Sequence, residues 1–183
     1  ASQALYGTNP FSFAWPRPTS TPVVFDMATA AMAMGDVQIA ARDGDKVPPG
    51  TGLNADGVPT TDPEEIIKGV LLPFGGYKGS HIAMMIELLA GPLVGETASY
   101  ASKSRDSGDG GPPQGGEFIL AMNPDMLSGA DWQAESEAFL AKLDALEGVR
   151  LPAERRYRNR QDTGPREINS DLLEKIRATL SSG

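Results

Sequence analysis

The first segment that could do chemistry is a glycine-rich turn that carries a lysine. It reads Gly75-Gly76-Tyr77-Lys78-Gly79 and directly precedes a run of residues with helical spacing. Glycine lets the backbone approach a ligand closely, and the N-terminus of a helix favours anions. Lys78 adds a positive charge for a phosphate or a carboxylate. The turn matches neither the P-loop nor the Rossmann fingerprint, and a strand-to-helix turn with a solvated lysine is an equally good interpretation.

A basic cluster offers a second place for an anion. It is the segment Leu151-Pro152-Ala153-Glu154-Arg155-Arg156-Tyr157, within the basic stretch 150–160. Arginine is suited to bidentate contacts with phosphate, so a local cluster in an acidic protein points to a specific anion. Ion pairs with the acidic helices of the same chain explain the cluster equally well.

Carboxylates and a turn complete the candidates. Asp26 lies in an apolar run, where a carboxylate needs a partner, and Asp36 follows a glycine. A carboxylate that orients and charges a histidine is a standard part of acid–base sites, although a cap is the favoured role for a lone aspartate after glycine. His81, the single histidine, lies on an apolar helix, where a structural role is favoured. The sequence Gly7-Thr8-Asn9-Pro10 is typical of a turn that presents a hydroxyl and an amide.

Short strands, helices and long loops are expected to position these residues. We expect extended chain over 5–28 with a buried strand over 22–28, a second strand over 117–122, and a short helical turn at Glu64-Glu65. Thr29 could cap a helix over 29–34 that Gly35 ends, and 36–42 form either a strand or a second helix. The helix over 80–95 is apolar on almost every face, so we expect it to be central and buried. Further helices are expected over 131–146 and 170–180, and loops over 43–63, 96–116 and 150–160.

Composition excludes several classes of function. The 183 residues include 16 basic and 24 acidic side chains, and a net charge of -8 makes a poor binder of nucleic acid or anionic membrane. With no cysteine and one histidine, this chain alone forms no disulfide, thiolate site or multi-histidine metal site. No apolar stretch reaches membrane-spanning length, and Ala1-Ser2-Gln3 lacks the features of a signal peptide. We therefore expect a cytoplasmic protein with no metal, nucleic-acid or membrane partner.

Several segments together resemble the malate/L-lactate dehydrogenase family of non-Rossmann NAD(P)-dependent oxidoreductases. They are residues 7–14, 24–29, 59–63 and 71–79, in this order, extended by 83–91 and by Leu151-Pro152. The resemblance implies an α+β fold with a large, mostly antiparallel dinucleotide-binding sheet flanked by helices, and a homodimer. It divides the chain into an NADP-binding sheet domain over 1–150, which contains the helix 80–95, and a basic cofactor loop with a C-terminal helix over 151–183.

Three segments are most similar to one branch of that family. Residues 13–18, 35–37 and 110–118 resemble the Δ1-piperideine-2-carboxylate/Δ1-pyrroline-2-carboxylate reductases, which reduce a cyclic imine with NADPH to L-pipecolate or L-proline. Family members are considerably longer, and this chain matches only their C-terminal portion. The N-terminal portion carries a Ser-His catalytic pair and a substrate-binding arginine. We therefore interpret the chain as a C-terminal fragment, or one product of a cleaved precursor, that is inactive without that portion and packs its C-terminal helix on it.

The resemblance also implies roles for individual residues. Asp36 is the catalytic residue, because it would complete a charge relay with the Ser and His of the N-terminal portion. Thr8 would contact substrate, and Met34 stands in the substrate site where relatives often have Arg. An arginine pair suits the 2′-phosphate of NADPH better than the diol of NADH. The implied cofactor-binding residues are Asp26, Met27, Ala28, Tyr77, Lys78, Leu151, Pro152, Ala153, Glu154, Arg155, Arg156 and Tyr157.

Two alternatives to an imine reductase stay open. The first is a malate- or lactate-type 2-hydroxyacid dehydrogenase of the same family, which reduces C–O and takes an oxo acid instead of an imine. Asp36 after Gly35 favours the imine reductase, because the hydroxyacid relatives often have Lys there. The second is a stable dimerisation fragment without activity.

Overall fold

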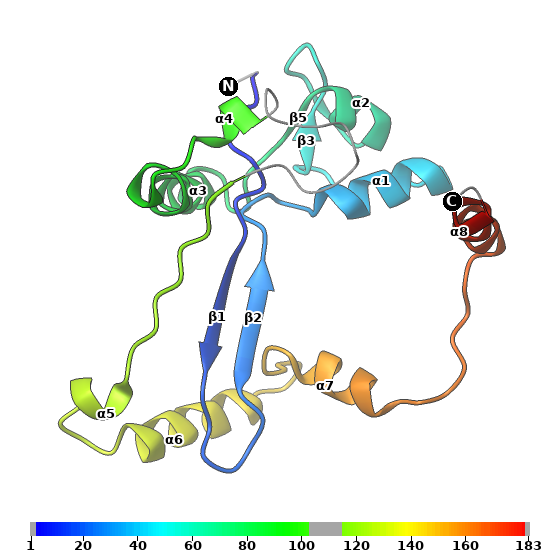
Figure 1. Cartoon of the computed structure of the whole chain (residues 1–183). Coiled ribbons are helices and arrows are strands. Elements are labelled where there is room, and N and C mark those ends of the chain that lie inside the picture. Colours follow the sequence, from blue (N-terminus) through cyan, green and yellow to red (C-terminus); the bar gives the residue numbers. More distant parts are fainter. Residues whose placement is uncertain (1–2, 103–114, 182–183) are drawn as a thin grey trace. The chain divides into compact units, whose positions relative to one another are not determined.

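The computed structural model describes residues 3–102 and 115–181, which belong to two compact units. The first unit ends at Ala138 and the second begins at Phe139. The boundary at 150/151 that the sequence predicts stays a prediction. In the first unit the elements are β1 (Phe11–Trp15), β2 (Val23–Met27), α1 (Met34–Asp43), β3 (Gly52–Leu53), β4 (Pro59–Thr60), α2 (Pro63–Lys68), β5 (Val70–Leu71), α3 (Tyr77–Ala90), the 3-10 helix η1 (Pro92–Val94), α4 (Ser99–Ser102) and α5 (Pro124–Leu127) (Figure 1). Helix α6 (Trp132–Asp144) crosses the division, and α7 (Glu154–Gln161) and α8 (Ser170–Ser181) follow in the second unit.

Strands β1 and β2 form an antiparallel hairpin (Figure 1). The hairpin confirms the strand expected within 22–28, and the extended chain expected before it contains a second strand, β1. Phe13 pairs with Phe25 across the hairpin, and their rings stack with centroids 5.3 Å apart. At the far end of β1, Trp15 meets Trp132 of α6 edge-to-face at 5.6 Å. Aromatic pairs of this kind contribute about 0.5–1.5 kcal/mol beyond their buried area. The first pair therefore stabilises the hairpin, and the second joins the hairpin to the first turn of α6.

An ion pair reinforces the contact between the hairpin and α6. Arg17 donates from Nε to Glu137 Oε1 at 2.8 Å and from a terminal nitrogen to Oε2 at 2.6 Å. These hydrogen bonds hold the pKa of Glu137 below its ordinary value. The stabilisation is therefore complete above the pKa of an unfolded-state glutamate, and it is lost as the pH falls through the lowered folded-state pKa.

A small core forms where α1 and α2 meet the second sheet, whose strand order is β4-β3-β5. Val37, Val47 and Ile66 are buried there, and Met32, Met34, Ala40 and Leu71 pack against them. Asp62 begins α2 by accepting a hydrogen bond from the backbone of Glu64, and a proline occupies the first turn. This start agrees with the helical turn expected after Pro63.

The prediction of a helix over 29–34 is wrong. The helix begins at Met34 with Gly35 inside its first turn, so the second option for 36–42, a helix, is the right one. It ends at Gly44, whose φ of 76° is in the left-handed region that suits glycine. Thr29 does not cap a helix because both its amide and its hydroxyl are bonded to the carbonyl of Thr8, far away in the sequence.

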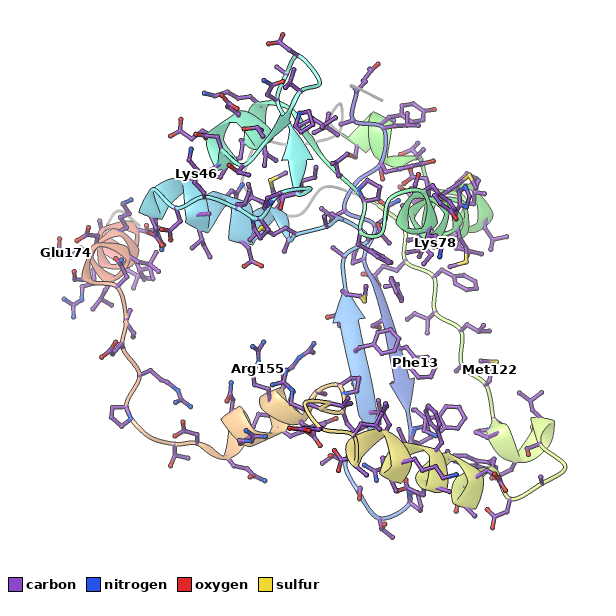
Figure 2. All side chains as sticks on the ribbon, turned by 180° about the vertical axis from the view of Figure 1, so that it is seen from behind. Phe13, Lys46, Lys78, Met122, Arg155 and Glu174 are labelled. Atoms are coloured by element: carbon purple, nitrogen blue, oxygen red, sulfur yellow. The ribbon has the colours of Figure 1, made fainter. Side chains whose placement is uncertain are left out.

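The prediction of one large antiparallel sheet is also corrected by the structure. Within the described ranges the sheets have two and three strands. Residues 117–122 have a strand-like sequence but no strand, since a strand requires a backbone partner and none pairs with them in the described part of the chain. Their apolar side chains are accordingly exposed, to 85% at Ile119 and 65% at Met122 (Figure 2).

Helix α3 differs from the expected helix in bounds and in burial. It begins before residue 80 and ends before residue 95, and η1 follows it. Instead of being buried all round, it exposes Tyr77, Met84, Met85 and Leu88. Apolar residues on every face indicate that a helix is buried by other segments. They do not indicate which segments bury it. No helix within 3–102 and 115–181 is long and apolar enough to cross a membrane.

Three expected loops contain regular structure. The segment 43–63 includes β3 and β4, and 96–116 includes α4, although residues 103–114 lie outside the described part. The basic stretch 150–160 is a loop only as far as Ala153, where α7 begins. Arginine and tyrosine are compatible with helix, so a basic composition did not identify a loop. Helices α6 and α8 confirm the two helices expected over 131–146 and 170–180.

The small core predicts a sharp difference between two adjacent isoleucines of α2. Ile66 is 1% exposed and Ile67 is 42% exposed. Ile66→Ala should lower the free energy of unfolding by about 2–5 kcal/mol, because it leaves a cavity in the core. Ile67→Ala is the matched control and should cost much less. Urea denaturation of both variants measures the difference, and equal losses would contradict the assignment of the core.

Candidate functional site

Thr29 lies where three segments of the sequence meet. It is 2% exposed. Its amide and its hydroxyl donate to the carbonyl of Thr8 at 2.9 and 3.0 Å, and its own carbonyl accepts from the amide of Phe74 at 3.0 Å. The amide of Ala31 donates to the carbonyl of Leu72 at 2.7 Å. These bonds bring the turn of Thr8, the end of β2 and the chain that leads into α3 to one place.

We call this meeting point of the three segments the Thr29 junction. The candidate residues next to it are at least partly accessible to solvent. Thr8 and Ala28 are half-buried, and Asp26 and Met27 at the end of β2 are exposed. The expectation of a buried strand is therefore wrong for these two residues. Asp26 is exposed within the described part of the chain, and an exposed carboxylate needs no buried partner.

The glycine-rich turn has a geometry that larger residues do not adopt. Gly75 and Gly76 have φ values of 57° and 63°, and a Cβ at Gly79 would overlap the carbonyl oxygen of Phe74. The turn thus places the start of α3 against the chain that leads to the Thr29 junction. Tyr77 and Lys78 are exposed in the first turn of the helix, so the ammonium group of Lys78 is available to an anion (Figure 2).

Asp36 and Met34 lie in the first turn of α1, a few residues after the junction. Asp36 is exposed, and its amide donates to the carbonyl of Ala33 at 3.1 Å. Its side chain does not cap the helix. Met34 is half-buried and packs against the Val37–Val47–Ile66 core, which accounts for an apolar residue at this position.

The basic segment forms a small pocket of its own in the second unit. The pocket has a volume of about 160 Å³. Leu151, one of its lining residues, is buried, and Ala153 adopts a φ of 71° at the turn into α7. The guanidinium of Arg160 lies 5.9 Å from the ring centroid of Tyr157. Pockets for drug-sized ligands measure about 300–1,000 Å³, so this one suits a single charged group such as phosphate. The lining residues are Arg150, Leu151, Pro152, Ala153, Arg155 and Arg156.

Sequence reasoning missed one polar cluster beside the junction. The carboxylate of Glu87 accepts hydrogen bonds from Asn9 Nδ2 at 2.7 Å, from Ser99 Oγ at 2.7 Å and from the backbone amide of Ser99. Asn9 was expected only as part of a turn, and neither Glu87 nor Ser99 was singled out. The available signal was that Glu87 is the one carboxylate in the apolar sequence of α3.

Comparison with known proteins gives a consistent group of relatives. Residues 1–177 match the family described as malate/L-lactate dehydrogenase. The chain is 48% identical over 160 residues to Δ1-pyrroline-2-carboxylate reductase of Ancylobacter novellus, which covers 86% of this chain and 47% of that protein. It is 43% identical over 181 residues to Δ1-pyrroline-2-carboxylate/Δ1-piperideine-2-carboxylate reductase of Pseudomonas aeruginosa, covering 92% of this chain and 53% of that one.

A solved structure gives the same result for the fold. The crystal structure of Δ1-piperideine-2-carboxylate reductase from Pseudomonas syringae superposes with a TM-score of 0.86 at 41% identity, over 97% of this chain and 55% of that one. The chain thus spans about half the length of the curated relatives it matches. The match along nearly the whole sequence and the similarity of the fold together establish that the chain belongs to the malate/L-lactate dehydrogenase family.

Proposed function

We propose that this chain, together with the N-terminal portion that its relatives carry, reduces the cyclic imines Δ1-pyrroline-2-carboxylate and Δ1-piperideine-2-carboxylate to L-proline and L-pipecolate with NADPH. The observation that carries the proposal is the similarity to reductases of these imines along nearly all of the chain. The arrangement of the candidate residues around Thr29 supports it, since substrate and cofactor must meet at one place for hydride transfer.

The chain's cations suit the binding of a dinucleotide. NADPH, when bound, supplies the hydride that reduces the imine carbon. We assign its 2′-phosphate to Arg155 and Arg156, which are exposed and line a pocket of phosphate size. Lys78, exposed at the start of α3, contributes a second positive charge, and Asp26, Met27 and Ala28 form the surface against which the cofactor rests.

Asp36 is assigned to the acid–base part of the reaction. The imine nitrogen must gain a proton when its carbon gains hydride, and a histidine of the N-terminal portion would supply it. An exposed carboxylate in the first turn of α1 is able to orient such a histidine and favour its charged form. Thr8, half-buried at the Thr29 junction, is the substrate contact in this assignment.

The N-terminal portion is also assigned a packing role. Helix α8 exposes Leu172, Ile176 and Leu180, which are spaced so that they form one apolar stripe. We propose that the N-terminal portion of the same protein covers this stripe. Because the Ser-His pair belongs to the N-terminal portion in this proposal, we expect the isolated 183 residues to be inactive.

The function is tested by assaying three preparations with NADPH. The complete enzyme should reduce Δ1-pyrroline-2-carboxylate and Δ1-piperideine-2-carboxylate and leave pyruvate and oxaloacetate largely unreduced. The isolated chain should reduce none of them, and adding the N-terminal portion should restore activity. Activity of the complete enzyme on the oxo acids alone would establish the 2-hydroxyacid dehydrogenase instead. Turnover by the isolated chain would overturn the division of the active site.

Cofactor choice gives a second prediction. Replacing Arg155 and Arg156 with Ala should raise the KM for NADPH much more than the KM for NADH, because only NADPH has the 2′-phosphate. The control is Arg158→Ala, which removes an exposed arginine of the same helix that does not line the pocket. Steady-state kinetics with both cofactors measure the effect. Equal weakening of both would assign the pair to the shared pyrophosphate or to structure.

Asp36→Asn gives a third prediction, because it removes the charge but nearly preserves the shape. In the complete enzyme it should lower kcat by about 10²–10⁴-fold, the typical contribution of positioned acid–base catalysis, with little change in the KM for NADPH. If Asp36 serves only the helix dipole, the loss is about 0.3–1 kcal/mol of stability and turnover persists. Asp43→Asn, at the other end of α1, is the control. Measuring Tm and kcat on the same preparations separates the two roles.

A further inference from the structure

The cluster around Glu87 joins α3 to both the Thr8 turn and α4. Besides the bond to Glu87, Asn9 Nδ2 donates to the carbonyl of Ala83 at 3.0 Å. Ser99 Oγ also lies 3.3 Å from Asn9 Oδ1. Asn9 is 7% exposed, and Glu87 and Ser99 are half-buried. A partly buried carboxylate with three donors is well satisfied, and removing its charge leaves those donors without an acceptor of equal strength.

Asn9 has a backbone conformation that needs such support. Its φ of 41° is in the left-handed region, which asparagine adopts more readily than other residues with a side chain but still at some cost, so contacts of its side chain help to hold it there. Its side-chain amide nitrogen is held by two acceptors of α3, the carboxylate of Glu87 and the carbonyl of Ala83. Gly7 makes room for this arrangement, since a Cβ there would lie 3.0 Å from Asn9 Oδ1 and 3.1 Å from Ser99 Oγ.

The backbone conformation of Asn9 determines how the preceding residue, Thr8, is oriented in the turn. Thr8 is its chain neighbour, and the carbonyl of Thr8 is the acceptor for both groups of Thr29. Thr8 is thus held from two sides, by Thr29 through its carbonyl and by Glu87 through Asn9. We infer that Glu87 is a positioning residue, which holds Asn9 in the left-handed conformation so that Thr8 presents its side chain to the substrate carboxylate or ring. This inference rests on the proposed function, because that function makes Thr8 a substrate contact.

Glu87→Gln tests the inference in the complete enzyme. Glutamine has nearly the same shape, but it places an amide nitrogen where Glu87 accepts from Asn9 or Ser99. We expect the KM for the imine to rise roughly 10- to 100-fold, the scale of cost of a misplacement of about 1 Å, with the KM for NADPH unchanged. Ser99→Ala removes one donor without removing the charge and should raise the same KM by a smaller factor. Glu135→Gln, on an exposed site of α6, is the control and should change neither.

A purely structural role for Glu87 gives a different result. It would lower the Tm and leave the KM for the imine unchanged at temperatures well below unfolding, and that outcome would overturn the inference. If the wild-type enzyme reduces oxo acids instead of imines, the proposed function fails, and the same comparison is made with the KM for the oxo acid.

Hydrogen exchange tests the structural step without any assay of activity. The amide of Thr29 is bonded to the carbonyl of Thr8, so its exchange rate reports whether the turn stays in place. In the complete enzyme, Glu87→Gln should accelerate exchange at Thr29 at least about tenfold, whereas Glu135→Gln should not. Unchanged protection of Thr29 in the Glu87 variant would show that Glu87 does not hold the Thr8 turn.

Discussion

The buried hydrogen bonds of Thr29 are the constraint on which the first unit depends. A buried amide or carbonyl must find a partner, and Thr29 finds all of its partners in segments that are remote in the sequence. Thr8 supplies one carbonyl to two donors, and Phe74 supplies the amide for the carbonyl of Thr29. Once these bonds form, β1 and β2 must leave the junction as a pair, and the chains into α1 and α3 must begin beside them (Figure 1).

The glycine-rich turn at the start of α3 and the Glu87 cluster near its end both contact the segments of the Thr29 junction. Gly79 lets the first turn of the helix touch the backbone of Phe74, which is itself bonded to Thr29. One turn before the helix ends, Glu87 holds Asn9, which precedes β1. The helix therefore contacts the junction at both of its ends, and its exposed face of Tyr77, Met84, Met85 and Leu88 lies away from these contacts. This division explains why an apolar helix carries one carboxylate.

The unit is held together more by specific contacts than by a large core. Among the described residues, the buried apolar cluster beneath α1 and α2 consists of Val37, Val47 and Ile66. Elsewhere the contacts are aromatic pairs along the hairpin and the bidentate pair of Arg17 and Glu137. Several apolar side chains of this unit stay exposed, at residues 118–122 and on α3, and large exposed apolar surface is typical of contact with another protein segment. The proposed N-terminal portion is a source of such a segment.

The sequence by itself determined the family, the second hairpin strand and helices α2, α6 and α8, and it supplied most of the residues that we propose for the site. These features depend on local patterns: alternating residues, helical spacing and short motifs that keep their order along the chain. The start of α1, the exposure of α3 and Asp26, the lack of a partner strand for 117–122 among the described residues, and the contacts of Glu87 were decided by tertiary structure. For α1 and for Glu87 the deciding partner is far away in the sequence, and for residues 117–122 the described chain provides no partner. Thr29 is bonded to Thr8 instead of capping a helix, Glu87 accepts from Asn9, and a strand does not form without a neighbour to receive its hydrogen bonds. The local sequence pattern limits which structures each segment is able to form, and the long-range hydrogen bonds determine which of these structures it adopts.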